Sequence, residues 1–249
     1  MVLLLFVELD PALGALRPLG GFFVLRTTVD PERAPLASSP TLAQAYESSR
    51  SDVYPISLTF RIRKVARSLR APELRVAASI AQLGLAARLW SVTLACAALY
   101  ERVPDLDPQL LRWDPDASAP DDLLLTEVRP RPADPATVAD TVLRGHLAPL
   151  HSALRARVAL ADGLLWGNAA SALAGAAREL DRWARAHGRD DVAARSHALT
   201  RALFTHPPLA GTGTFRDTAF RRRSCCLYYR VPGGGLCGDC GLSRVPGRG

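Results

Sequence analysis

Cysteines gathered near one end of the sequence have the clearest chemical meaning. Four of the five lie within sixteen residues, as Cys225, Cys226, Cys237 and Cys240, in the pattern C-C-x10-C-x2-C. Four thiolates fill the outer coordination positions of two tetrahedral irons bridged by two sulfides. The glycines at 233–235 suit a chain that wraps such a cluster, because glycine adopts left-handed conformations and lets backbone N–H groups approach sulfur. The spacing therefore favours a 2Fe-2S cluster.

Zinc and disulfides are the alternatives that the spacing leaves open. A four-cysteine zinc site usually takes its ligands in pairs separated by two to four residues, which fits Cys237 and Cys240 but not the adjacent Cys225 and Cys226. Disulfides are disfavoured in a reducing compartment. We expect a cytoplasmic protein, because the apolar run at 2–7 follows no basic residues and differs from a secretory signal.

Three arginines and a tyrosine flank the first cysteine pair. Arg221, Arg222 and Arg223 precede it, and their charge would stabilise an anionic cluster and raise its reduction potential. They are equally suited to contact an anionic electron donor or membrane headgroups, or to lie solvated on the surface. Tyr228 follows the pair and is expected to shield the cluster from water, although packing alone also explains it.

Two tryptophans with polar neighbours are further candidates. Trp90 and Trp166 fall on predicted apolar helix faces, which is more typical of core residues than of a substrate platform. Arg88 and Asn168 lie close to them in sequence, and a polar group beside an apolar face needs a partner. We treat both as pocket candidates, with a buried structural hydrogen bond as the alternative.

Hydrophobic periodicity predicts a mainly α fold, a helical bundle with a minor N-terminal β element and an irregular C-terminal iron-sulfur segment. From residue 72 apolar residues recur every three or four positions, predicting a helix that ends before Pro104. Further helices are expected over 143–165, continuing through 169–187, and over 191–204, with the 143–165 stretch packed on the first helix. Runs at 21–28, 56–62 and 123–128 favour extended structure. The expected regions are 1–70 (mixed), 71–215 (helical body) and 216–249 (cluster segment).

Charge and missing motifs narrow the partners. A net charge of +7 permits nucleic acid, anionic lipid or an acidic protein, but selects none of them. Neither G-x-G-x-x-G nor G-x-x-x-x-G-K-[ST] follows a predicted strand, so we expect no flavin or nicotinamide site and an external electron donor. The apolar stretch at 76–100 contains Arg88 near its middle, at a cost of roughly 2.5–3.5 kcal/mol on insertion scales. We therefore expect no membrane span there.

The cysteine pattern closely resembles the C-terminal 2Fe-2S signature of the FhuF family of ferric-siderophore reductases. Segments at 87–91, 103–106, 165–168 and 207–213 resemble the same family more weakly, so the likeness covers roughly residues 75–242. It implies a cytoplasmic enzyme of iron acquisition that donates one electron to a ferric siderophore and releases Fe(II). We expect no nucleic acid partner, and the arginines before the first cysteine pair would allow peripheral contact with the inner membrane surface.

Two other functions remain open at this stage. One is an iron-sulfur electron carrier or redox sensor that acts on a protein partner. The other is a zinc-stabilised basic module that binds nucleic acid or a protein.

Overall fold

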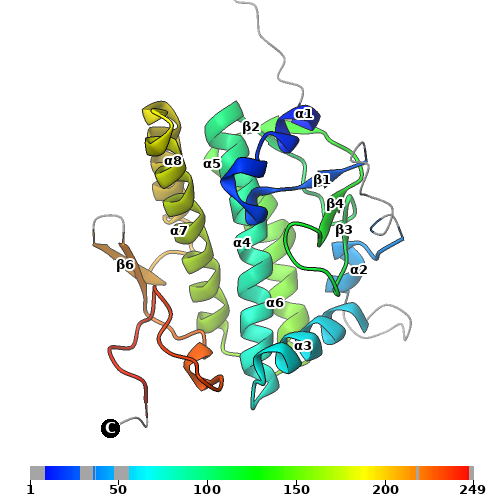
Figure 1. Ribbon diagram of the computed structural model, residues 1–249, viewed down its shortest axis with the longest axis vertical. Helices are drawn as coiled ribbons and strands as arrows, with labels where there is room; N and C mark the ends of the chain where they lie inside the picture. Colours follow the sequence, from blue (N-terminus) through cyan, green and yellow to red (C-terminus); the bar gives the residue numbers. More distant parts are fainter. Residues whose placement is uncertain (1–8, 29–35, 37, 48–55, 217–218, 247–249) are drawn as a thin grey trace, which may run out of the picture.

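The computed structural model describes residues 9–28, 36, 38–47, 56–216 and 219–246. It confirms the mainly α prediction, with α8, α7 and α4 side by side, the strands β1, β3 and β4 on the far side of α4, and β6 beside α7 (Figure 1). The helices are α1 (Leu9–Gly14), α2 (Leu42–Tyr46), α3 (Ile56–Leu69), α4 (Leu74–Tyr100), α5 (Pro135–Ala139), the π-helix η4 (Asp140–Leu147), α6 (Ala148–Arg155), α7 (Asp162–Ala186) and α8 (Asp190–Leu203), with short 3-10 turns η1 (Arg17–Leu19), η2 (Gly21–Phe23) and η5 (Tyr228–Arg230).

Helix α4 forms the centre of the bundle and ends at Tyr100, as predicted. Most of its side chains are buried, and it packs on α7, α3 and α8. Its mean hydropathy of 1.4 and its length would also permit a membrane span, but 72% of that apolar window is buried inside the protein. The Arg88 side chain in the middle of α4 forms a buried ion pair with Asp122. These features are typical of the core helix of a globular bundle.

The predicted helix over 143–165 is interrupted in the structure. Helix α6 ends at Arg155 and α7 begins only at Asp162, after an extended residue at Ala161. Arg157 stabilises the end of α6 by donating to the Ala153 carbonyl at 2.8 Å. The break lets α7 run back along α4, so α7 is the main packing partner of α4, whereas α6 contacts α2. The 191–204 helix is confirmed as α8.

The predicted extended run at 56–62 is wrong, because these residues form the start of α3. Leu58 and Ile62 are buried and Val65 packs against the same core, at spacings that place all three on one helix face. The run at 21–28 forms the turn η2 and only a two-residue strand, Arg26–Thr27. The first eight residues lie outside the described residues.

Short strands complete the body and begin the tail. They are β1 (Arg26–Thr27), β2 (Arg102–Pro104), β3 (Leu111–Trp113), β4 (Leu123–Leu125), β5 (Pro130–Pro132), β6 (Gly213–Arg216) and β7 (Ala219–Arg222). β4 lies within the extended piece predicted at 123–128, and pairs parallel to β1 and antiparallel to β3. β2 pairs with β5. The antiparallel β6–β7 hairpin was not predicted, so the C-terminal segment is only partly irregular.

The hydrophobic core is continuous through the predicted regions. One cluster of buried side chains contains Leu13 from the N-terminal part, Trp90 from the helical body and Phe220 from the tail. The boundaries of the three regions near residues 70 and 215 therefore stay predictions from the sequence. What matters for the site is that α4 and α7 offer the tail a rigid surface.

Candidate metal centre

The tail runs from the β6–β7 hairpin past the outer side of α7 (Figure 1). Two turns shape it, with Leu227 at φ 68° and Gly233 at φ 73°. A Cβ atom at Gly234 would lie 2.4 Å from the Tyr228 carbonyl oxygen, so this turn requires glycine. The turns bring the Cys225–Cys226 pair back against Cys237 and Cys240.

The four sulfurs meet as two pairs. Side-chain hydrogen bonds join Cys226 to Cys237 and Cys225 to Cys240. All five cysteines are free thiols in the structure. Two pairs of thiols supply the four thiolate ligands that two irons bridged by two sulfides require.

Backbone N–H groups surround the sulfurs in a repeated pattern. The N–H of the residue two positions after each cysteine donates to that cysteine, from Leu227 to Cys225, Tyr228 to Cys226, Asp239 to Cys237 and Leu242 to Cys240. The first of these N···S distances is 3.3 Å. Such donors stabilise thiolates and a negatively charged cluster. The donor set therefore fits a 2Fe-2S cluster.

Arg222 is the charged group that touches this arrangement. Its side chain is only 2% exposed, and its Nη2 donates to Cys237 Sγ at 2.8 Å. The hydrogen bond from Cys226 and the Arg222 guanidinium both lower the pKa of Cys237. A thiol with a lowered pKa is more readily present as the thiolate that binds iron.

A chain of hydrogen bonds connects Arg222 to the helical body. Arg222 Nη1 donates to Asn168 Oδ1 on α7 at 2.5 Å, and Asn168 Nδ2 donates to the Ser79 carbonyl on α4 at 3.0 Å. Ser79 Oγ in turn donates to the Cys226 carbonyl at 2.8 Å. Asn168 and Ser79 are fully buried. These bonds fix both the arginine and one cysteine relative to α4 and α7.

A second set of contacts holds Asp239, which lies between the last two cysteines. Its carboxylate accepts from Ser171 Oγ at 2.5 Å and pairs with Arg178 Nη2 at 3.1 Å, both on α7. Close approach is also needed where Gly167 meets the tail, because a Cβ there would lie 2.0 Å from Ser224 Oγ. Helix α7 is thus the docking surface of the tail.

Three of the other predicted site residues, all in the tail, lie away from the cysteine sulfurs. Arg221 and Arg223 are exposed, and Tyr228 is 37% exposed at the start of η5. Arg221 donates to the Gly241 carbonyl at 3.2 Å, whereas the Arg223 backbone N–H bonds to Thr212. No contact described for these three side chains reaches a cysteine sulfur.

Of the four predicted body residues, only Asn168 reaches the cysteine site. Arg88 pairs with Asp122 at 2.9 Å, and it also donates to two backbone carbonyls near η2. Trp90 is buried in the core. Trp166 packs edge-on against His151, with 4.4 Å between ring centroids.

Ser171, Arg178 and Asp239 were not predicted. The signal available in sequence was a polar stripe, because positions 168, 171 and 178 share one face of an otherwise alanine-rich helix. Such a stripe on a helix that is buried elsewhere indicates a polar partner segment.

Comparison with known protein families agrees with this geometry. Residues 222–241 match the FhuF 2Fe-2S C-terminal domain, and all four cysteines lie in the matched segment. The match supports the resemblance seen in the sequence and identifies the cofactor as a 2Fe-2S cluster, which replaces the zinc alternative. The chain is thus an iron-sulfur protein. No curated protein matches the chain significantly.

Proposed function

We propose that this protein is a ferric-siderophore reductase of the cytoplasm, with Cys225, Cys226, Cys237 and Cys240 as the cluster ligands. When bound, a 2Fe-2S cluster stores and passes on a single electron. One electron passes to the chelated Fe(III), which becomes Fe(II). An external one-electron donor then returns the protein to its reduced state. Hard oxygen ligands hold Fe(II) less tightly than Fe(III), so the metal can then dissociate.

The observation that carries this proposal is that the cysteine site opens to the surface. Cys237 and Cys240 are half-buried and line an open hollow of about 370 Å³ together with Arg216, Arg221 and Leu236. A cluster held here would lie near solvent, where a soluble chelate or a donor protein can approach. The helical body fixes the site from behind through α4 and α7.

The protein's own residues then have distinct roles. Arg222 places a buried positive charge at Cys237, which favours the reduced and more negative state of the centre. Asn168 holds the guanidinium in position. Arg221 and Arg216 add charge at the hollow, which suits an acidic donor protein or contact with anionic membrane headgroups.

An electron carrier that serves a protein partner is the second candidate. The same open hollow favours it, because a docking protein also needs the cluster near the surface. The two candidates differ in what accelerates oxidation of the reduced centre.

Single-turnover oxidation tests the proposal. Protein reduced with dithionite and freed of excess reductant is mixed with a panel of ferric siderophores, and cluster absorption is followed by stopped flow. A reductase should be oxidised at rates that saturate with chelate concentration and differ among chelates. Rates that follow only the driving force, as with a simple inorganic oxidant, would contradict the proposal. The Cys226→Ser variant should lose the cluster signal and the reaction but keep its helical circular dichroism.

A further inference from the structure

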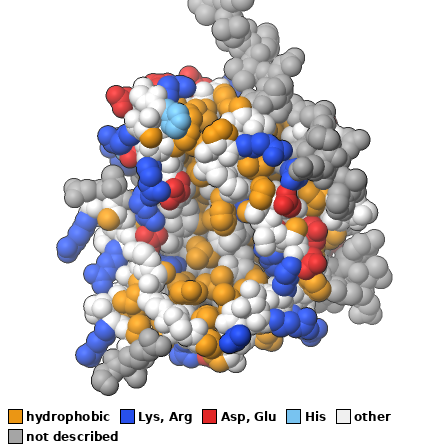
Figure 2. Space-filling model, viewed as in Figure 1, with side chains coloured by type: hydrophobic (Ala, Val, Ile, Leu, Met, Phe, Trp, Pro, Cys, Tyr) orange, Lys and Arg blue, Asp and Glu red, His pale blue; other side chains and the backbone are white. Residues whose placement is uncertain are grey.

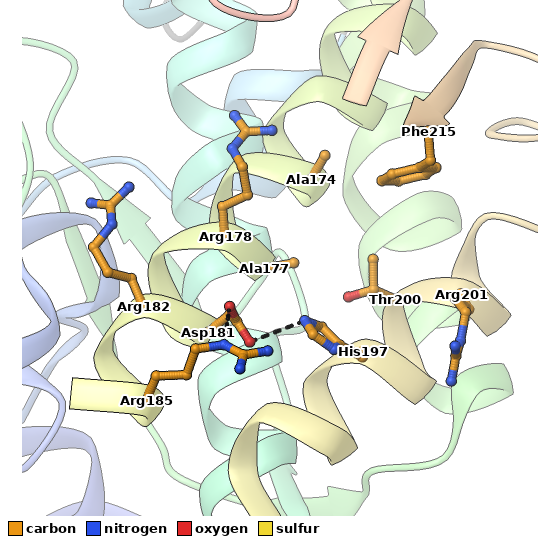
Figure 3. A pocket seen from close by; sticks show the side chains of 10 residues that line it. All are labelled: Ala174, Ala177, Arg178, Asp181, Arg182, Arg185, His197, Thr200, Arg201 and Phe215. Carbon is orange, nitrogen blue, oxygen red and sulfur yellow. Dashed lines mark hydrogen bonds and ion pairs between the residues drawn. The ribbon is translucent and has the colours of Figure 1, made fainter. Parts of the chain in front are cut away.

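A second pocket lies beside the cysteine site, between α7, α8 and β6. Its volume is about 570 Å³, within the range of small-molecule sites. Ala174, Ala177 and Phe215 give it an apolar lining. Figure 3 shows Arg178 and Arg182 on the α7 side of the pocket, and Thr200 and Arg201 on the α8 side. An apolar lining with a few polar groups is typical of ligand sites.

Positive charge predominates at this pocket. Among the described residues that line it, four are arginines and Asp181 is the single acidic side chain. The Asp181 carboxylate is held by Arg185 at 2.9 Å and approached by His197 at 3.2 Å, so its charge is offset locally (Figure 3). Figure 2 shows Lys and Arg side chains gathered along the side of the molecule formed by α7, α8 and the tail.

Two of these arginines are available to a ligand. Arg201 makes no ion pair within the described part of the chain. Arg182 pairs only with Glu179, one turn away on the same helix, and its side chain is 71% exposed. An exposed pair of this kind contributes little to stability and exchanges readily for a stronger anionic ligand.

Polar atoms without partners also mark the pocket. Thr200 is only 6% exposed, and its hydroxyl has no hydrogen-bond partner among the described residues. Arg178 Nη1 also has no hydrogen-bond partner among the described residues, whereas Nη2 of the same guanidinium pairs with Asp239. Buried polar atoms normally have partners, so these two indicate unmet capacity to bind an oxygen-rich ligand.

The pocket is connected directly to the cysteine site. Arg178 lines the pocket and pairs with Asp239, which lies between Cys237 and Cys240 in sequence. Phe215 of β6 lines the same pocket and packs on Phe220 of β7, just before Arg222. A ligand that touches Arg178 would therefore be separated from the last two cysteines by one ion pair.

We propose that this arginine-lined pocket binds a ferric chelate of net negative charge, such as a tricatecholate or polycarboxylate complex. The inference rests on the proposed reductase function and specifies its substrate class. Arg182 and Arg201 supply the attraction, and the alanine and phenylalanine surface contacts the chelator backbone. Neutral trihydroxamate complexes gain nothing from these charges and should bind more weakly.

Gallium(III) chelates test this binding without any redox reaction, because gallium(III) replaces iron(III) in such complexes but is not reduced. Isothermal titration calorimetry on the cluster-loaded protein compares a gallium tricatecholate with a neutral gallium trihydroxamate. We expect the anionic complex to bind at least about tenfold more tightly, with affinity falling as salt is raised. Arg182→Gln and Arg201→Gln should each weaken it by about three- to tenfold, the effect of one partly screened charge.

Arg144→Gln is the matched control. Arg144 is an exposed helical arginine, with 78% of its side chain accessible, and pairs with Asp140 on its own helix. Its loss removes the same charge at a distance from the pocket and should leave binding unchanged. Thr200→Val, which keeps the shape of the side chain, should weaken binding without changing the salt dependence.

The outcomes separate this inference from the proposed function. Equal affinity for the two gallium complexes, or pocket variants that bind like Arg144→Gln, would overturn the pocket assignment. If the reduced protein still turned over neutral ferric trihydroxamates in that case, the reductase proposal would stand alone. Tight, arginine-dependent binding of the anionic complex, with no chelate-dependent oxidation of the cluster, would support the pocket and refute the reductase.

Discussion

Replacing Arg222 by glutamine should lower the reduction potential of the cluster by about 100 mV. The arginine is 2% exposed and its Nη2 lies 2.8 Å from Cys237 Sγ. Its charge therefore acts on the centre with little screening by water or salt. Reduction adds negative charge to the centre, and a nearby positive charge favours that state. Removing the charge must make the potential more negative.

The magnitude follows from Coulomb's law. With the guanidinium charge about 6 Å from the added electron and an effective dielectric constant of about 20, the interaction is about 3 kcal/mol. A tenfold change in a one-electron equilibrium, about 1.4 kcal/mol, corresponds to about 59 mV. The expected shift is therefore on the order of 100 mV. Glutamine retains hydrogen-bonding capacity toward Asn168, so the charge is the main change.

An EPR-monitored redox titration measures this shift, and the neighbouring arginines provide matched controls. Arg221→Gln and Arg223→Gln each remove one charge next to Arg222 in sequence, but both side chains are exposed. At about 10 Å through water the same calculation gives about 20 mV. Arg222→Lys retains the charge and should stay close to the wild-type potential.

An Arg222→Gln potential within about 20 mV of wild type would refute this reasoning. So would equal shifts for Arg221→Gln and Arg222→Gln, because burial would then not matter. If Arg222→Gln failed to assemble a cluster, Arg222→Lys should still assemble one with a potential close to that of wild type, and a large shift in that variant would contradict the charge argument.

Three further predictions concern docking, the buried ion pair and pH. Gly167→Ala should displace the tail and reduce cluster occupancy, because the new Cβ would meet Ser224 Oγ, while the melting temperature of the helical body stays nearly unchanged. Adding Ser224→Gly should restore cluster occupancy, and a double variant without rescue would count against this contact. Arg88→Met should lower the free energy of unfolding in urea titrations by about 3–5 kcal/mol, since it leaves Asp122 buried and unpaired. The reduction potential of the cluster should not change. A shift in potential like that of Arg222→Gln would place Arg88 at the site instead. Burial lowers the pKa of His146 to about 4, so as pH falls from 7 to 4 the unfolded chain takes up a proton that the folded chain does not. The free energy of unfolding of wild type should therefore fall by about 3 kcal/mol relative to that of His146→Gln. A constant difference between the two proteins would show that His146 is not buried in its neutral form.

The cysteine site could be predicted from sequence because its donors are close together in the chain. The pattern from Cys225 to Cys240 contains all four thiols, and the N–H donors lie two residues after each of them. Arg222 could be named only as one of three arginines. Its selection depends on burial against Asn168, a contact between residues 54 positions apart.

The errors have similar physical causes. Residues 56–62 are too few to separate a two-residue from a 3.6-residue period, and packing on α4 decided in favour of α3. The break before Asp162 lies in a run of helix-forming residues, where tertiary packing of α7 overrides local propensity. Pairing of β6 with β7 likewise depends on contact with the body, since Phe220 is buried in the common core.

The grouping of all four thiols in one short stretch after the helices has a consequence for biogenesis. A ribosome synthesises α4, α7 and α8 before it reaches Cys225, and chain segments generally fold in the order in which they emerge. The surface that receives the tail can therefore form before any ligand is available. Iron and sulfide need to be delivered to one accessible loop region rather than to a half-folded interior, which makes insertion of the inorganic core a late maturation event.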